Sequence, residues 1–92
     1  MAEDKSGVTA VEVDGVGIEV DMAYIRSWAG VVQAGRMASS QLSDTDRFLA
    51  MVGYYESAIA NIDEVTEAVG GRPADEVFAL LSEAVKEATP KN

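Results

Sequence analysis

Carboxylates are the side chains of this sequence that come closest to a chemical site. Asp44 and Asp46 lie two residues apart, and Asp63, Glu64 and Glu67 form a second group further along the chain. Such groups could hold Ca²⁺ or act as a general acid and base. Neither group has the D-x-D-x-D-G spacing and terminal glutamate of a calcium loop, and acids three or four residues apart on a helix are most often caps or solvated side chains. We therefore expect no metal site and no catalytic residue.

A glycine pair before an arginine suggests a second chemistry, phosphate binding. Gly70-Gly71-Arg72 precedes a predicted helix, and a helix N-terminus can hold an anion. The segment lacks the preceding strand, the lysine and the longer glycine spacing of a phosphate-binding loop. A helix end followed by a turn is the simpler interpretation, and we expect no cofactor.

The overall composition narrows the function further. The 92 residues include no cysteine and no histidine, which excludes thiol nucleophiles, disulfides, zinc fingers and imidazole bases. Sixteen acidic residues against seven basic ones give a formal net charge of −9, which disfavours nucleic acid and anionic membranes as direct partners. We therefore expect a non-enzymatic protein whose partner is a neutral or basic protein. Residues 1–5 lack the basic and apolar regions of a signal peptide, and no apolar run approaches membrane-spanning length, so we expect a cytoplasmic location.

The first predicted element is a β-hairpin over residues 8–20. Residues 8–13 and 16–20 are rich in β-branched side chains that partly alternate, and Asp14-Gly15 between them is typical of a two-residue hairpin turn. A lone hairpin is only marginally stable in water, so one of its faces should pack on helices. The candidates for that apolar face are Val11, Val13, Ile18 and Val20.

Helices should follow the hairpin. Asp21 can cap the first helix, which we expect to end near Gly35, before a linker or weakly helical connection over residues 36–42. Ser43 can cap the second helix, predicted over residues 44–62. The apolar side of the first helix would carry Met22, Ile25, Trp28, Ala29 and Val32. The apolar stripe of the second would carry Phe48, Val52, Tyr55, Ile59 and Ile62.

The glycine pair separates the last two helices. Residues 62–69 predict a short third helix, and Pro73 is well placed as the first residue of the last one. The apolar face of that last helix would carry Val77, Phe78, Leu81, Ala84 and Val85.

These elements predict an α+β fold that is mostly α-helical, with an N-terminal β-hairpin followed by three or four helices in a small bundle. Residues 8–88 should form a single domain, with the hairpin over 8–20 and helices over 21–88. Residues 1–7 should be a disordered N-terminus and residues 89–92 a disordered tail.

The tripeptide Trp28-Ala29-Gly30 matches the W-x-G motif of small, acidic, helical-hairpin secretion substrates. Membership of that class implies two long antiparallel helices and no strand, with the tripeptide in the turn between them. The alternative interpretation makes Trp28 a core or groove residue. A W-x-G-type secretion substrate or adaptor is therefore the second functional hypothesis.

The order of elements resembles the tail assembly chaperones of long-tailed bacteriophages and prophages over nearly the whole chain. The departures are a first helix that is longer and less acidic than in that family, and an unusual connection through residues 36–38. The matching features are the hairpin of residues 11–21, a first helix with Asp21, Ile25 and Trp28, a capped helix over 42–59, an acidic helix ending at Gly70-Gly71-Arg72-Pro73, and the final helix around 75–83.

The resemblance implies a non-enzymatic protein that binds the tape measure protein, a very long helical chain with exposed apolar stripes. It would keep that chain soluble until tail tube subunits polymerise around it. The tail tube protein and a second copy of this chain are further partners to consider. The resemblance also implies a place in the bacterial host cytoplasm and absence from the mature virion.

Partner contacts should come from large aromatic and aliphatic side chains, because these dominate interface energetics. The same side chains are the best candidates for the core, so the sequence leaves open which role each one has. The candidates are Tyr24, Trp28, Tyr55, Phe78 and Leu81.

Overall fold

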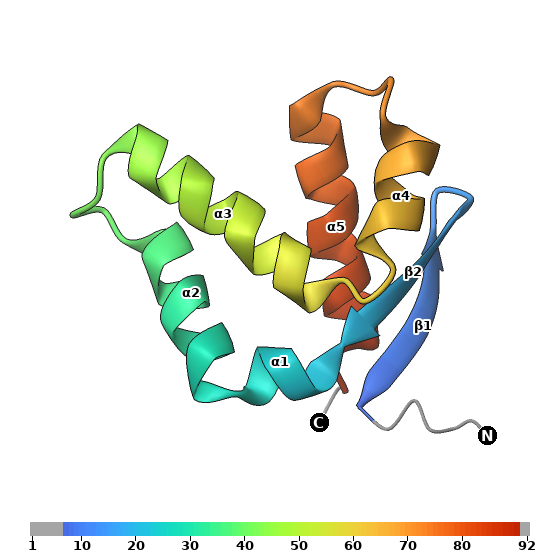
Figure 1. Cartoon of the computed structure of the whole chain (residues 1–92), viewed down its shortest axis with the longest axis horizontal. Coiled ribbons are helices and arrows are strands. Elements are labelled where there is room, and N and C mark those ends of the chain that lie inside the picture. The colour runs from blue at the N-terminus through green and yellow to red at the C-terminus, as the bar shows by residue number, and fades with distance from the viewer. Residues whose placement is uncertain (1–6, 91–92) are drawn as a thin grey trace.

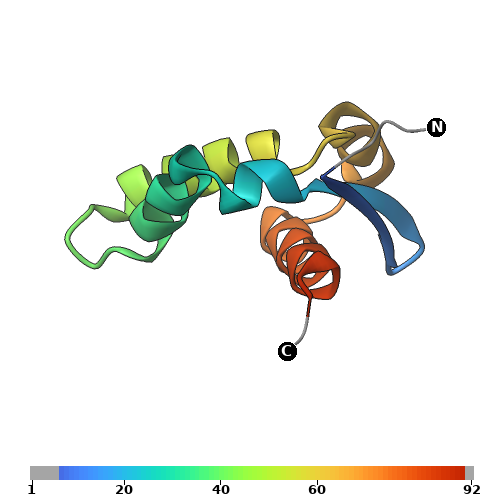
Figure 2. The same cartoon turned by 90° about the horizontal axis from the view of Figure 1, so that it is seen from below.

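The computed structural model describes residues 7–90 and has the predicted class of fold, an N-terminal β-hairpin followed by helices (Figure 1). The strands are β1 (Val8–Val13) and β2 (Val16–Asp21). The helices are α1 (Met22–Arg26), α2 (Trp28–Ala38), α3 (Asp44–Ala58), α4 (Ile62–Val69) and α5 (Ala74–Ala88). In both views α2 and α3 lie side by side as an arm that points away from the hairpin and α4 (Figures 1 and 2).

The hairpin forms with the register that its turn requires. β1 and β2 pair antiparallel, and Val13 lies opposite Val16 where the turn closes. Asp14 and Gly15 both have positive φ angles, 55° and 79°, as in a type I′ turn. The predicted apolar face is confirmed, since Val11, Val13, Ile18 and Val20 lie in or against the core together with Val16.

The outer edge of β2 is covered by the junction between α3 and α4. The backbone amide of Glu19 donates to Asn61 Oδ1 (2.8 Å), and the amide of Ala60 donates to the carbonyl of Glu19 (2.7 Å). Asn61 Nδ2 also donates to the carbonyl of Gly17 (3.1 Å). Residues 59–61 therefore satisfy backbone groups of β2 in the way that a short third strand would.

The predicted first helix is in fact two helices. A continuous helix from residue 22 to about residue 35 is wrong, because the chain breaks at Ser27, whose backbone is extended (φ −74°, ψ 161°). The Ser27 amide donates to the Tyr24 carbonyl at the end of α1, and Ser27 Oγ accepts from the Gly30 amide at the start of α2. A Cβ atom on Gly30 would lie 2.1 Å from the Tyr24 carbonyl oxygen, so only glycine fits here.

Three other boundaries differ from the prediction. α2 continues past the expected end near Gly35 to Ala38, into the segment 36–42 that was expected to be a linker or a weakly helical connection. α3 ends before Ile59 and not at residue 62, because Ile59 takes an extended conformation (φ −103°, ψ 109°) and bridges to β2. Pro73 precedes the first residue of α5 and does not itself start the helix. The short helix predicted over 62–69 is confirmed.

The core lies between the hairpin and the helices. No charged or polar side chain within residues 7–90 is buried in it. Its largest fully buried side chains are Ile18, Val20, Ile59 and Val65. The rest of the buried cluster is Val16, Met22, Tyr54, Tyr55, Ala58, Val69, Leu80, Leu81, Ala84 and Ala88.

Both ends of the described chain are attached to neighbouring helices. The Gly7 carbonyl accepts hydrogen bonds from the first two amides of α1, and Thr89 Oγ1 donates to the Val85 carbonyl (2.7 Å). The disorder predicted for residues 1–6 and 91–92 lies outside the described residues. Across residues 7–90 there is no helix with the length and apolar character needed to cross a membrane.

Candidate protein-binding surface

The large apolar side chains that remain exposed are concentrated on the arm. Within residues 7–90, Trp28 and Val31 of α2 are 80% and 53% exposed, and Phe48 and Leu49 of α3 are 48% and 60% exposed. Single exposed apolar residues are common on protein surfaces, so these four mark a binding site only where they adjoin further apolar surface. The arm and the surfaces that border it are therefore the place to look for a binding site.

A groove lies between α3, α4 and α5. It consists of two adjoining hollows of about 210 and 160 Å³ that share Thr66 and Phe78. The side chains that line the first hollow include Val69, Ala74 and Val77, and those that line the second include Val52, Tyr55, Ile62 and Leu81. We call this surface the α3–α5 groove. It is mainly apolar, and it is open to solvent rather than enclosed.

Aromatic side chains connect the groove to the arm. Phe48 on α3 meets Phe78 on α5 edge-to-face, with ring centroids 5.6 Å apart and an interplanar angle of 89°. Phe78 also lies against Tyr55, and the series continues from Tyr55 to Tyr54 (5.3 Å) and from Tyr54 to Tyr24 (5.9 Å). Because Phe48 is half exposed and contacts the groove wall, it lies at the mouth of the groove.

Burial shows in the acid–base properties of two of these tyrosines. Desolvation raises the pKa of the Tyr54 phenol above its usual value of 10.0, and the nearby Tyr55 and Tyr24 add to the shift. Desolvation also raises the pKa of the Tyr55 phenol, although a hydrogen bond with Ser82 opposes it. Both phenols are therefore neutral at physiological pH, and the groove wall carries no phenolate charge.

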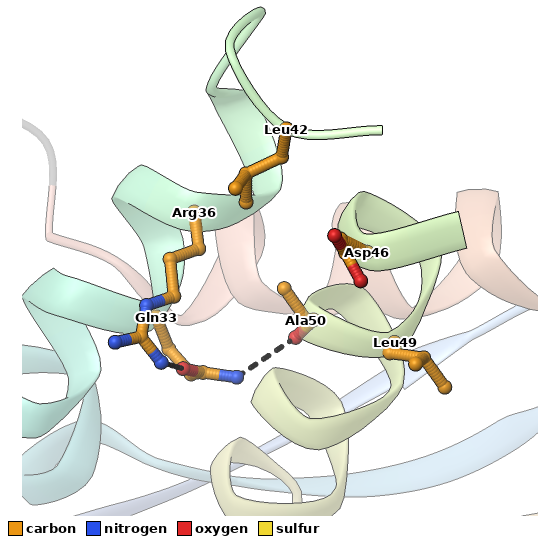
Figure 3. Close-up of a pocket in the computed structure, with 6 residues that line it drawn as sticks. All are labelled: Gln33, Arg36, Leu42, Asp46, Leu49 and Ala50. Carbon is orange, nitrogen blue, oxygen red and sulfur yellow. Dashed lines mark hydrogen bonds between the residues drawn. The ribbon is translucent and has the colours of Figure 1, made fainter. Parts of the chain in front are cut away.

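The arm contains a second hollow, between α2 and α3, of about 450 Å³ (Figure 3). Gln33 Nε2 donates to the Ala50 carbonyl (3.2 Å) across its base, and Arg36 Nη1 approaches Gln33 Oε1 at 3.5 Å. Leu42 and Leu49 supply its apolar lining, and Arg36 and Asp46 its charges. The lining of this hollow is more polar than that of the α3–α5 groove, and its central polar groups already bond to each other.

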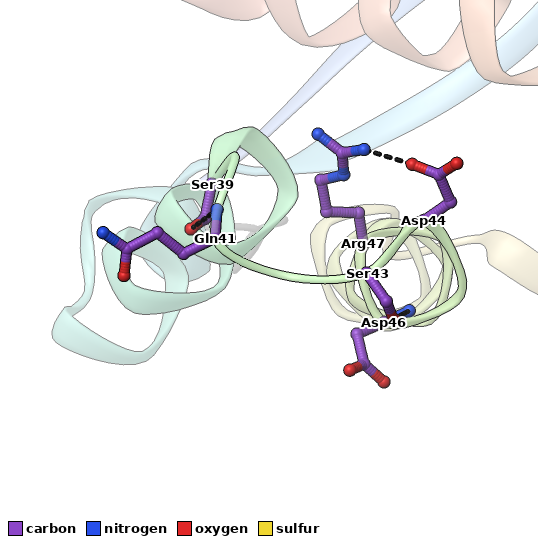
Figure 4. Close-up of polar contacts among 6 residues, drawn as sticks. All are labelled: Ser39, Gln41, Ser43, Asp44, Asp46 and Arg47. Carbon is purple, nitrogen blue, oxygen red and sulfur yellow. Dashed lines mark hydrogen bonds and ion pairs between the residues drawn. The ribbon is translucent and has the colours of Figure 1, made fainter.

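An N-cap and an ion pair stabilise the first turn of α3 at the tip of the arm (Figure 4). Ser43 Oγ accepts a hydrogen bond from the Asp46 amide (3.1 Å), which is the N-cap predicted for α3. Arg47 forms an ion pair with Asp44 within the first turn. No group of three or more acids within residues 7–90 is arranged to hold a metal ion.

The five predicted contact residues fall in three places. Tyr55, Phe78 and Leu81 line the α3–α5 groove. Tyr24 is half buried beside Tyr54, away from the groove lining. Trp28 is exposed on α2. Its assignment to the buried side of the first helix is therefore wrong, and so is the interpretation of Trp28 as a core residue.

Sequence reasoning missed other surface residues. It placed Phe48 on the buried stripe of α3, whereas half of this side chain is exposed, and it did not select Leu49 or Val31. Leu49 follows Phe48 by one residue and so falls off the stripe, which was the available signal that it faces elsewhere. No protein-family model, no curated protein and no solved structure matches this chain.

Proposed function

We propose that this protein is a tail assembly chaperone of the long-tailed bacteriophage type, which binds the tape measure protein and keeps it soluble while the tail assembles. One observation carries the proposal: an open apolar groove between α3, α4 and α5, with half-exposed Phe48 at its mouth. Recognition of an amphipathic helix typically uses such a groove, into which side chains of the helix insert at i, i+3, i+4 and i+7.

The charges around the groove fit this role. Glu56 and Arg72 are the charged residues of its lining, and Arg72 is already paired with Asp14 (2.7 Å). Asp63, which follows the lining residue Ile62 on α4, is a further exposed acid. A neutral or basic helix would therefore bind there more readily than an acidic one, while the net charge of −9 would keep the complex dispersed.

The test is co-expression with the tape measure protein of the same genome, followed by measurement of its soluble fraction and of the complex. We expect Phe48→Glu to weaken binding by about tenfold or more, because it places a charge at the mouth of an apolar groove. Leu49→Glu is the matched control, because Leu49 is adjacent in sequence and similarly exposed but lines the hollow between α2 and α3. Circular dichroism of both variants should match that of the parent chain.

Two results would contradict the proposal. The first is a tape measure protein that is equally insoluble with and without this chain. The second is equal loss of binding in both variants, or a selective loss in Leu49→Glu, which would move the binding site from the α3–α5 groove to the other hollow of the arm.

The W-x-G hypothesis receives no support from a specific contact. Trp28-Ala29-Gly30 occupies the first turn of α2, and Gly30 serves there as the close neighbour of the Tyr24 carbonyl. That class implies two long antiparallel helices and no strand, whereas this chain has the β1–β2 hairpin.

A further inference from the structure

The hairpin has one covered edge and one open edge. The junction between α3 and α4 bonds to the outward backbone groups of Gly17 and Glu19 on β2, and Figure 1 shows β2 between this junction and β1. The residues opposite them on β1 are Glu12 and Ala10, whose backbone groups therefore point out of the hairpin at its other edge. Both residues are exposed, and within residues 7–90 no hydrogen bond reaches their amides or carbonyls.

A hollow of about 330 Å³ lies between β1 and α5. The described residues that line it come from the end of β1, from the turn and from α5 with the residues before it, and none comes from β2. The hollow therefore opens on the β1 side of the hairpin, next to the open edge. A strand that paired with β1 would turn every second side chain toward α5 and this hollow. We call the open edge of β1 and the hollow together the β1–α5 site.

The hollow has an excess of acidic groups. Its charged residues are Asp14, Arg72, Glu76 and Glu83, and its apolar floor includes Val13, Ala79 and Leu80. Arg72 is already paired with Asp14 (2.7 Å), so it neutralises neither glutamate. Glu83 lies 3.9 Å from Lys86 Nζ, at the limit of an ion pair, and the Glu76 carboxylate has no ion pair within residues 7–90. The hollow therefore suits a cationic side chain.

We propose that the β1–α5 site binds an extended, basic segment of a partner protein, which adds a strand beside β1. Main-chain hydrogen bonds to Ala10 and Glu12 hold the segment, as in other cases of strand addition to a sheet edge. A lysine or arginine side chain of the segment enters the hollow and pairs with Glu76 or Glu83. The apolar stem of that side chain packs on Leu80.

A second copy of this chain fits the site less well. β1 contains no basic residue, so two paired β1 strands would place no cation in the hollow. Each copy also has a net charge of −9, and two such copies repel.

The β1–α5 site and the α3–α5 groove lie on different faces of α5. Glu76, Leu80 and Glu83 face the hollow at helical spacing, whereas Phe78 and Leu81 line the groove. The site takes an extended segment rather than a helix. The inference therefore goes beyond the proposed chaperone function and holds whether or not the groove binds a tape measure protein.

The experiment titrates the full chain into fluorescein-labelled peptides of about eight residues and measures fluorescence anisotropy. The first peptide alternates valine or threonine with lysine, and the second has glutamate in place of lysine. We expect the lysine peptide to bind with saturation, and added salt to weaken this binding. The glutamate peptide should not bind.

Two methylated versions of the lysine peptide test pairing as a strand. The amides of a strand point alternately to its two sides, so N-methylation of every second residue blocks the side facing β1 in one version and the solvent side in the other. One version should bind about tenfold more weakly or worse, and the other should keep its affinity. On the protein, Ala10→Pro removes an outward amide without removing a hairpin bond, and it should also weaken binding. Urea unfolding checks that this variant folds.

Variants of α5 test the hollow. The double substitution Glu76→Gln and Glu83→Gln should weaken binding of the lysine peptide about fivefold or more. The matched control is Asp63→Asn with Asp75→Asn, because these acids are also exposed and lie outside the lining of the hollow. The control removes the same amount of charge and should leave the affinity unchanged.

Five outcomes would overturn the inference. Three come from the peptides: no saturable binding of the lysine peptide, equal binding of the glutamate peptide, or equal affinities of the two methylated versions. The fourth is equal weakening in the α5 double variant and its control. The fifth is dimerisation of the chain alone that Ala10→Pro abolishes, which would assign the edge to a second copy. None of these measurements involves a tape measure protein or Phe48, so failure here is distinguishable from failure of the proposed chaperone function.

Discussion

Replacement of Gly30 by alanine tests the break between α1 and α2. The added Cβ would lie 2.1 Å from the Tyr24 carbonyl oxygen and 3.0 Å from the Tyr24 carbonyl carbon, so these backbone atoms must separate by about 1 Å. The Tyr24 carbonyl cannot move freely, because it accepts hydrogen bonds from both the amide (3.0 Å) and the hydroxyl (2.6 Å) of Ser27. The substitution must therefore strain or break the contacts that hold the two helices at their angle.

The expected loss of stability follows from these contacts. Two weakened hydrogen bonds cost about 1–3 kcal/mol together. Overpacking against backbone costs about 1–3 kcal/mol more. Alanine regains about 1 kcal/mol of helix propensity relative to glycine. We therefore expect Gly30→Ala to lower the free energy of unfolding by about 1–5 kcal/mol and Tm by about 4 °C or more.

The assay is urea and thermal unfolding monitored by circular dichroism, with Gly35→Ala as the control. Gly35 lies in the same helix, and a Cβ there would meet no atom within 4 Å. That substitution should raise the free energy of unfolding by about 0.5–1 kcal/mol through propensity alone. If Gly30→Ala is as stable as the parent chain or more stable, α2 does not approach Tyr24 closely in solution, and the described break is incorrect.

Three further predictions concern other contacts. Asn61→Ala should lower the free energy of unfolding by about 1–3 kcal/mol, because it leaves the edge of β2 without the amide partner; urea denaturation measures this, and an unchanged midpoint would contradict it. The pair Asp14–Arg72 is largely exposed, so a double-mutant cycle with Asp14→Asn and Arg72→Gln should give a coupling below about 1 kcal/mol that decreases with salt; a larger, salt-independent value would refute this assignment. Burial raises the pKa of Tyr54 and Tyr55 in the folded chain, so the unfolded chain loses these phenol protons at lower pH. The free energy of unfolding should therefore be constant with respect to these groups below about pH 10 and decrease above it. Tyr55→Phe should make that decrease with pH smaller, as measured by unfolding at several pH values.

Local signals in the sequence predicted most of the fold. Asp14-Gly15 specifies a turn with two positive φ angles, and the Ser43 hydroxyl specifies the start of α3, because each of these requirements is met by the residue itself. Gly70 likewise marks the end of α4. The fold class and the start of α3 needed no knowledge of distant contacts.

The two main errors have different causes, a local cap that interrupts helical spacing at Ser27 and a long-range contact at Ile59. Met22, Ile25 and Trp28 follow helical spacing, yet Ser27 interrupts the helix by bonding to both sides of the break, and this turns Trp28 out to solvent. Gly30 was the clue, since a glycine within a predicted helix can mark close backbone approach. α3 ends early because Ile59 bridges to β2, a partner about forty residues earlier, which periodicity does not reveal.

The candidate surface was only partly accessible from sequence. Aromatic and aliphatic side chains of similar type are found in the core, in the groove and on the outside of α2, as Leu81, Phe78 and Trp28 illustrate. Residue type identifies all three as candidates for binding, but burial separates them, and burial depends on how the helices pack. The sequence pattern did not predict the break at Ser27, which sets the direction of α2 and so decides which of its side chains are exposed.

The cover on the edge of β2 has a consequence for synthesis of the chain. The hairpin is made first, but Ala60 and Asn61, which bond to its second strand, are added about forty residues later. Domains fold during synthesis from the N-terminal end, and a hairpin by itself is marginal in water. Until Asn61 has left the ribosome, the nascent chain therefore carries an uncovered strand edge, and this is the interval in which we expect it to be most prone to pairing with other chains.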